Sequence, residues 1–462
     1  MGCCMTTRTT PAFLPPTERK RRYDILGNLA VEAEISDNPL QLPLDALFAM
    51  AARKNKKRGF LFVSKLLGKH IPVEPQLALL AGRALAELLA AGNPEQPSAE
   101  LAEIADAMRH PEAAASLYDR LASRRLAVAD DTLFIGFAET ATALGHGMFA
   151  AFEGAVSYLH TTRETIPGRS VCVTFEEEHS HATSHRCYMD EPERFKLART
   201  IVLVDDELTT GRTALNIIDD LHRKYGSDRF VIASLLDWRS DEDRARFAEF
   251  EEERGISIAV VALLSGRLTL EGSPLEGEQG IRVLKPTSGT AIPLRRIDLS
   301  ECFKRARSSE GELAYLRLSG RFGLDHAGQL ELDEEIGRAA SVCKSARTGA
   351  RVLCMGTGEF MYVPMRIAAG MGEGVFYQST TRSPIHPVDQ ADYAVRNGWS
   401  FEAPDHPDLL NYMYNIPEGR YDELFFFMER PVPLTEELIK VLQDLNIPSI
   451  HLVACGKEET TE

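Results

Sequence analysis

The sequence predicts an α/β protein built on a parallel sheet flanked by helices, with a second α/β domain after it. From Thr132 onward, short continuous apolar segments alternate with helical ones, which is typical of parallel strands buried on both faces. Of the 462 residues, 44% are hydrophobic and 26% are charged, the composition of a globular protein with a substantial core. At about 150 residues per domain, the length allows roughly three domains.

Acidic residues outnumber basic ones by 68 to 52, giving a net charge of −16. This surplus argues against a general nucleic-acid binder, whose affinity depends on neutralising phosphates. No apolar run reaches the roughly 18 residues of a membrane span, so we expect no membrane partner, a cytoplasmic location and reduced cysteines. Residues 1–22 resemble a disordered leader, although Met1-Gly2-Cys3-Cys4 also fits an acylation signal.

The first half of the chain contains one early strand, a helical region and then the alternating core. The early strand is Phe60 to Ser64, and the helical region from Pro75 to Leu126 is broken at Gly92-Asn93-Pro94 and near Pro111. The strands expected in the core are Thr132 to Phe137, Ala155 to His160, Thr200 to Val204, Phe230 to Leu236 and Ile256 to Leu264.

The pattern becomes irregular and charged over 287–298 and 302–310, so we place the junction between two domains there, with domains at 23–300 and 301–462. The second domain repeats the alternation. Its expected strands are Tyr315 to Leu318, Arg351 to Met355, Gly374 to Gln378, Glu423 to Met428 and Ser449 to Ala454.

The sharpest motif runs from Ile201 to Thr213, where an apolar strand ends in Asp205-Asp206 and a Thr/Gly loop opens a helix near Ala214. Ligands of open α/β sheets bind at such strand tips. The amides of the loop and the start of the helix suit a phosphate monoester, while the carboxylates suit a polyol about one ribose ring away. An acidic strand end before an ordinary capped helix is the alternative, but a cap needs only one such residue.

This motif resembles the phosphoribosyl pyrophosphate (PRPP) signature of type I phosphoribosyltransferases. The resemblance implies PRPP as substrate and Mg²⁺ as cofactor, with the metal held at Asp205 and Asp206. It also implies a diphosphate-binding loop at Ala138, Glu139 and Thr140, although an acid at Glu139 would repel diphosphate unless Mg²⁺ lies between them. The expected PRPP-binding residues are Asp205, Asp206, Thr209, Thr210, Gly211, Thr213, Ala138, Glu139 and Thr140.

A long connection between Thr161 and Leu197 carries three histidines, and connections of this length are usually lids or binding loops. In the family, the loop at this place closes over PRPP and excludes water. Histidines there could move a proton near neutral pH, so His179, His181 and His185 are the catalytic candidates. A zinc site that includes a glutamate and a solvated polar loop are the alternatives.

Upstream, Ser64, Lys65, Lys69 and His70 lie on a strand-turn unit. In orotate-type members such a segment holds the acceptor base, so the resemblance makes these four residues acceptor-binding candidates. A surface hairpin with solvated lysines is the alternative.

The second domain resembles a weakened copy of the first, with a chance match between two glycine-containing α/β segments as the alternative. Leu353 to Glu359 matches Leu133 to Glu139, and Val375 to Arg382 matches Val156 to Arg163, but the acid pair and the Thr/Gly loop are missing after Glu423 to Met428. We expect a degenerate duplicate that does not bind PRPP.

The sequence Thr381-Arg382-Ser383-Pro384, together with the PRPP motif, resembles the bacterial two-domain phosphoribosyltransferases with a C-terminal TRSP domain. That resemblance implies a link to tellurite-resistance and stress operons and to a nucleoside-like metabolite. Arg382 is a further acceptor-binding candidate, or else pairs with an acid between the domains. The expected partners are PRPP and a small acceptor, with no nucleic acid; a PRPP sensor, reverse transfer and a homodimer stay open.

Overall fold

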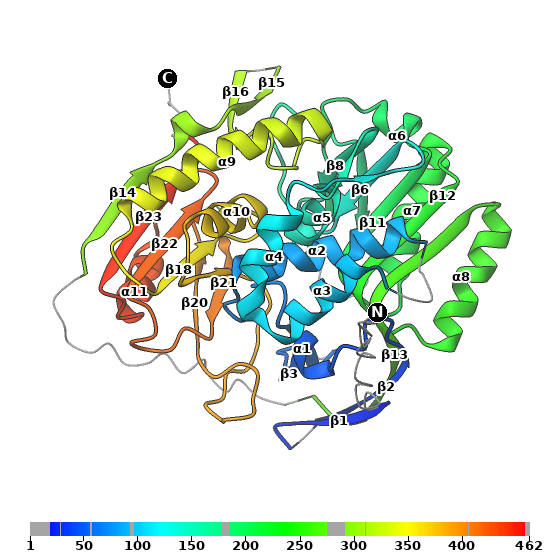
Figure 1. Cartoon of the computed structure of the whole chain (residues 1–462), viewed down its shortest axis with the longest axis horizontal. Helices are drawn as coiled ribbons and strands as arrows, with labels where there is room; N and C mark the ends of the chain where they lie inside the picture. Colours follow the sequence, from blue (N-terminus) through cyan, green and yellow to red (C-terminus); the bar gives the residue numbers. More distant parts are fainter. Residues whose placement is uncertain are drawn as a thin grey trace, which may run out of the picture.

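The computed structural model describes residues 19–27, 29–55, 58–92, 97–176, 184–274, 292–309, 311–404 and 406–457. Its elements form two sheets that lie side by side, with α2, α5 and α10 between them (Figure 1). No helix in these ranges is both long and apolar enough to cross a membrane.

The first sheet, within the described residues, has eight strands in the order β1-β2-β13-β12-β11-β6-β8-β17. Its central strands from β13 to β8 run parallel, and the edge pairs are antiparallel. The bounds are β1 Lys20–Ile25, β2 Leu29–Asp37, β13 Ser257–Gly272, β12 Arg229–Asp237, β11 Thr200–Leu208, β6 Thr132–Gly136, β8 Val156–His160 and β17 Leu324–Asp325.

Helices flank this sheet as the alternating pattern predicts. In α7, the buried side chains recur at helical spacing and face the sheet, and Gly226 ends the helix in the left-handed conformation at φ 77°. The helices of this half are α1 Leu44–Leu47, α2 Pro75–Ala90, α3 Ala99–Arg109, α4 Ala114–Leu121, α5 Ala141–Phe149, α6 Arg194–Leu197, α7 Arg212–Tyr225 and α8 Asp241–Arg254.

The second sheet, among the described residues, has the order β14-β23-β22-β18-β19, and all its strands are parallel. By their places in the chain, β19, β18, β22 and β23 correspond to β8, β6, β11 and β12, so these four strands have the same order in both sheets, as duplication predicts. The next strand differs, because β14 precedes the others in the chain whereas β13 follows β12. The bounds are β14 Leu294–Asp298, β23 Ser449–Ala454, β22 Glu423–Met428, β18 Val352–Gly356 and β19 Val375–Ser379, with α9 His326–Ala346, α10 Tyr362–Gly370 and α11 Glu436–Asp444.

Short two-stranded units lie outside the two sheets. Two of them occupy similar places in the chain: β9–β10 follows β8 and bridges to Thr162, and β20–β21 follows β19 and bridges to Thr381. The bounds are β3 Phe48–Ala52 with β4 Phe60–Ser64, β9 Val173–Glu176 with β10 Ser184–Cys187, β15 Arg305–Ser308 with β16 Gly311–Leu316, β20 Gly398–Ala403 with β21 His406–Tyr414, and β5 Leu126–Ala127 with β7 Phe152–Glu153.

Two expectations about the chain's organisation need correction. The leader was expected to extend to residue 22, but β1 begins at Lys20 and pairs with β2. The segment 287–298 was expected to be irregular, but its last part forms β14, which pairs in the second sheet. Residues 1–18 lie outside the described residues.

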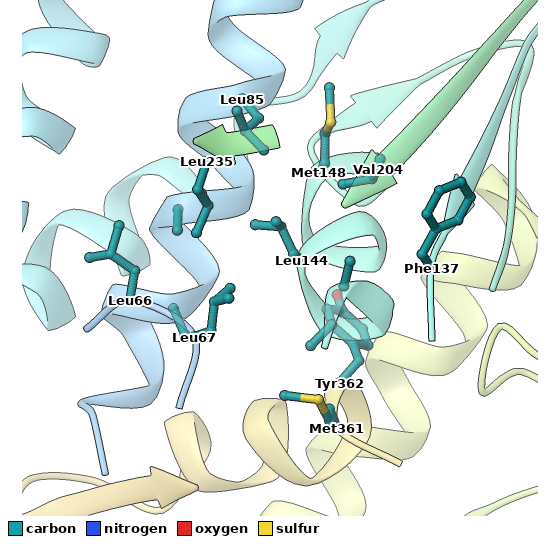
Figure 2. Packing of buried hydrophobic residues seen from close by; sticks show 14 of the residues in the cluster. Leu66, Leu67, Leu85, Phe137, Leu144, Met148, Val204, Leu235, Met361 and Tyr362 are labelled. Carbon is teal, nitrogen blue, oxygen red and sulfur yellow. The ribbon is translucent and has the colours of Figure 1, made fainter. Parts of the chain in front are cut away.

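One hydrophobic cluster runs through both halves of the chain. Figure 2 shows Met361 and Tyr362 of the second half beside Leu144 of α5, with Leu66 and Leu67 nearby. The two halves therefore share a core around α5.

Candidate active site

The acid pair lies at the carboxyl end of β11, between the parallel neighbours β6 and β12. The loop after it turns sharply at Gly211, whose φ of 71° suits glycine, and an added Cβ there would lie 2.5 Å from the Phe247 ring. The helix α7 begins at Arg212, two residues before the expected start. Half-buried Thr209, Thr210 and Thr213 flank this turn.

The site carries more negative charge than its neighbours compensate. Burial and the repulsion of Asp206 raise the pKa of Asp205 well above its usual range. Burial and the charge of Glu207 raise the pKa of Asp206 to about 6. A cation or a set of hydroxyl donors would relieve this repulsion.

Arg58 holds the neighbouring acid. Its guanidinium donates to both carboxylate oxygens of Glu207, at 2.6 and 2.9 Å, and stacks over Phe60 with its Cζ 4.7 Å from the ring centroid. This pair ties the β3–β4 hairpin to the end of β11. Sequence reasoning missed Arg58, since a basic residue before a strand carries no signal of a partner so far along the chain.

The expected diphosphate loop follows β6 and lies beside the acid strand, where the Phe137 amide donates to the Val204 carbonyl at 3.0 Å. The Ala138 amide donates to the Thr161 hydroxyl at 2.8 Å, and Thr140 immediately precedes α5. Three of the nine predicted PRPP residues thus lie in the loop that follows the strand next to the acid pair.

Glu139 does not present a bare charge. Its carboxylate lies 3.1 Å from the Lys69 ammonium and accepts from the Arg382 amide at 3.2 Å. Although burial opposes ionisation, Lys69, Arg382 and Arg163 outweigh it and lower the pKa of Glu139. The repulsion of diphosphate that the sequence suggested is therefore offset by cations of this chain.

The four acceptor candidates near the hairpin β3–β4 lie in different environments. Lys69 is 1% exposed and also donates to the Gly358 carbonyl at 3.0 Å. Burial, with the charges of Lys69 and Arg53, lowers the pKa of His70 to about 3, so this ring is neutral. Ser64 accepts from the Leu66 amide at 3.2 Å, and Lys65 donates to the Asp45 carbonyl at 2.8 Å.

His179 and His181 lie outside the described residues, whereas His185 lies on β10 and is 1% exposed. Its Nδ1 is 2.9 Å from the hydroxyl of Thr161, the same hydroxyl that holds the Ala138 amide. The Arg163 guanidinium donates to its Nε2 at 3.4 Å. His185 thus connects the hairpin β9–β10, through Thr161, to the loop at 138–140.

Within the described ranges, no group of three or more His, Cys, Asp or Glu side chains is arranged to hold a metal. Asp205 and Asp206 supply two carboxylates, which is the number that Mg²⁺ commonly takes from a protein when substrate and water complete its shell. The donor set and its excess charge fit such a cation.

Comparison with protein families agrees with this geometry. A phosphoribosyl transferase family matches residues 47–267, and the TRSP domain that lies C-terminal to that transferase domain matches residues 318–445. The chain therefore belongs to the phosphoribosyltransferases with a C-terminal TRSP domain, and it is an enzyme of that class. No curated protein matches the chain significantly.

Several solved structures are similar to parts of the chain. Adenine phosphoribosyl transferase from Trypanosoma brucei is 10% identical, covers 53% of this chain and 87% of its own, and has a TM-score of 0.29. The adenine phosphoribosyltransferase from Giardia lamblia is 18% identical, covers 35% of this chain and 84% of its own, and has a TM-score of 0.22. The adenine phosphoribosyltransferase from Rhodothermus marinus is 15% identical, covers 40% of this chain and 98% of its own, and has a TM-score of 0.21.

Proposed function

We propose that this protein transfers the 5-phosphoribosyl group of PRPP to a nitrogen of a small acceptor and releases pyrophosphate. The observation that supports it most is the uncompensated pair Asp205 and Asp206 beside the Thr/Gly loop of 209–213. Hydroxyl donors of a ribose and a divalent cation are the groups that would relieve this charge.

The parts of the site take different roles in this proposal. The amides and hydroxyls of 209–213 bind the 5-phosphate, Asp205 and Asp206 orient the ribose and hold Mg²⁺, and the loop at 138–140 receives the diphosphate. When bound, Mg²⁺ would neutralise charge on the diphosphate. Catalysis by this chain's own residues is then positioning, electrostatic stabilisation and exclusion of water by the 161–197 connection.

The acceptor belongs beside the hairpin β3–β4. Ser64 and Lys65 are half-buried there and remain our acceptor-binding candidates, whereas the Lys69 ammonium is already engaged by Glu139. A nucleoside-like product in a stress response, which the TRSP resemblance implies, would be consistent with a base-like acceptor.

The first experiment measures PRPP binding by calorimetry in the presence of Mg²⁺. The double variant Asp205→Asn/Asp206→Asn should lose binding while keeping its fold. A matched control changes another adjacent acid pair, Asp219→Asn/Asp220→Asn on α7, and should bind as the wild type does. Unchanged PRPP affinity in the first variant would refute the assignment of the site.

The second experiment separates transfer from sensing. Purified protein with PRPP, Mg²⁺ and a metabolite extract should yield pyrophosphate and a new phosphoribosyl adduct detectable by mass spectrometry. Tight PRPP binding without either product would favour the alternative, a PRPP or nucleotide sensor.

A further inference from the structure

The second half repeats the arrangement around the PRPP site contact by contact. The hairpin β9–β10 pairs with Thr162 through Arg186, and the hairpin β20–β21 pairs with Thr381 through Tyr412. The Thr380 hydroxyl accepts from the Gly358 amide at 2.9 Å, as Thr161 accepts from Ala138. The second sheet therefore has a covered strand tip equivalent to the PRPP site.

A cavity of about 40 Å³ lies at this second strand tip. The loops after β18, β19 and β22 line it, and the β20–β21 hairpin contributes Phe401 and Asn411. Among the described residues that line it, none belongs to the PRPP motif at 201–213. A ligand in this cavity would therefore be held by residues outside that motif, and the space is several times what one water needs.

Most charges around the cavity are already paired. Arg321 contacts Glu359 and Glu429, each at 2.9 Å, and Arg430 contacts Glu164 at 2.9 Å. These ion pairs form part of the cavity wall. Arg382 is the remaining arginine that lines the cavity.

Two polar groups that line the cavity lack partners. Within the described part of the chain, the guanidinium of Arg382 makes no hydrogen bond or ion pair, and its Nε is buried. Asn411 is only 6% exposed, and its Oδ1 also has no partner among the described atoms. Buried polar atoms are nearly always hydrogen-bonded, so these two atoms point to a ligand that satisfies both.

We propose that this cavity is a second ligand site for a small, flat carboxylate that also carries an N–H or O–H donor. The carboxylate binds the fork of Arg382, and the donor meets Oδ1 of Asn411. The apolar face of the ligand packs against the side chains of Phe401 and Met428, which also line the cavity.

The test uses three matched probes on the full chain, with binding followed by NMR titration. Pyrrole-2-carboxylate has both groups, furan-2-carboxylate lacks the N–H, and pyrrole-2-carboxamide lacks the charge. We expect the first to bind most tightly, with a loss of about tenfold for each missing group, the usual size of one hydrogen-bonding contribution.

The variants assign the contacts. Asn411→Leu should make pyrrole-2-carboxylate and furan-2-carboxylate bind equally, and Arg382→Gln should weaken both carboxylates about tenfold, with Arg382→Lys between it and the wild type. Arg396→Gln, which removes an exposed arginine paired with Asp389, is the control and should change nothing. The Asp205→Asn/Asp206→Asn variant should keep carboxylate binding, so failure of the PRPP assignment is a separate result.

Three results would overturn the proposal. The first is that no probe binds saturably up to about 10 mM. The second is that Arg382→Gln and Asn411→Leu leave probe binding unchanged. The third is that all three probes bind equally. Thermal melting of each variant checks that it is folded. If Arg382→Gln does not fold, the comparison of Arg382→Lys with the wild type tests the same contact.

Discussion

The carboxylates of Asp205 and Asp206 lower the stability of the ligand-free protein, whereas we expect them to favour ligand binding. Because their pKa values are raised in the folded state, the folded protein binds more protons than the unfolded chain above the ordinary aspartate pKa, and for Asp206 this window extends to about 6. Their ionisation therefore reduces stability as the pH rises through this window. The site keeps an arrangement that costs stability until a ligand is bound.

The first prediction follows from that sign. Asp206→Asn should stabilise the ligand-free protein at pH 7.5, raising Tm by about 1 to 3 °C for a chain of this size, and should raise Tm by a smaller amount near pH 4.5, where only part of the window has been crossed. Differential scanning calorimetry at the two pH values measures this. A Tm that falls at pH 7.5 would show that Asp206 is stabilised by a contact in the free protein.

PRPP binding should have the opposite pH dependence. Since Mg²⁺ and ribose hydroxyls need the ionised acids, PRPP affinity should fall as the pH drops below about 6, the pKa to which Asp206 is raised. Calorimetric titrations between pH 5 and 8 check this. A flat profile would indicate that Asp206 is not a ligand.

Lys69 and Glu139 form a buried pair in the first half of the chain, and both also contact the second half, Lys69 at the Gly358 carbonyl and Glu139 at the Arg382 amide. Lys69→Met should leave the Glu139 carboxylate without its main partner and cost about 3 to 5 kcal/mol. Adding Glu139→Gln should recover much of this loss, because the remaining amide carries no charge. Urea unfolding of both variants measures the difference, and additive losses would show that the two side chains are not coupled.

At the scale of elements, the alternating pattern in the sequence predicted the parallel strands well. The expected strands at Phe60 to Ser64, Glu423 to Met428 and Ser449 to Ala454 have the bounds that the structure shows. Such strands are apolar and local in their signal. The acid pair could be located for the same reason, because it directly follows the apolar run 201–204, although in the structure β11 continues past it to Leu208.

The elements that sequence reasoning missed depend on partners far along the chain. The strands β9 and β10 have four residues each, β17 has only two, paired with β8, and the nine-residue β21 mixes polar with apolar residues. Polar or very short strands have no periodic signal of their own. Likewise, the partners of Arg58 and Lys69 are fixed by tertiary packing and could not be read from spacing.

The hairpin β9–β10 leads to a prediction about the histidines. His181→Ala and His185→Ala should lower turnover by the roughly 10² to 10⁴ typical of a lost general acid or base, with a smaller effect on PRPP affinity. Steady-state kinetics and calorimetry separate the two effects. His110→Ala, at an exposed histidine after α3, is the control.

Elemental analysis distinguishes the remaining alternatives for the histidine-rich segment. Stoichiometric zinc in the wild type that is lost in both variants would favour a metal site. Unchanged kinetics in both variants, without zinc, would favour a solvated loop with no catalytic role.

At the scale of the whole molecule, each half of the chain pairs a short segment with the edge of the other half's sheet. Val73, which precedes α2, pairs with Tyr377 at the edge of β19, and Leu324, which precedes α9, pairs with Tyr158 of β8. The side chains across the junction are reciprocal as well. Thr381 and Arg382 hold Glu139, while Thr162 and Arg163 hold Glu359.

This exchange means that the transferase half should depend on the TRSP half for its fold. A chain ending at residue 300 loses β17, which covers the edge of β8, and exposes the part of the shared core that Met361 and Tyr362 fill. It also loses the Thr381 and Arg382 contacts to Glu139, so the diphosphate loop is no longer held from both sides.

The fragment 1–300 should therefore lack a cooperative thermal transition, bind a hydrophobic dye and fail to bind PRPP. Co-expression with the fragment 301–462 should restore all three properties, because the missing contacts are non-covalent and the exchanged edges lie on separate pieces. Size-exclusion chromatography, calorimetry and PRPP titration of the fragments measure this. If the fragment 1–300 alone melted cooperatively and bound PRPP as the full chain does, the exchanged edges and shared core would be dispensable, and the second half would act on the first only through its ligand.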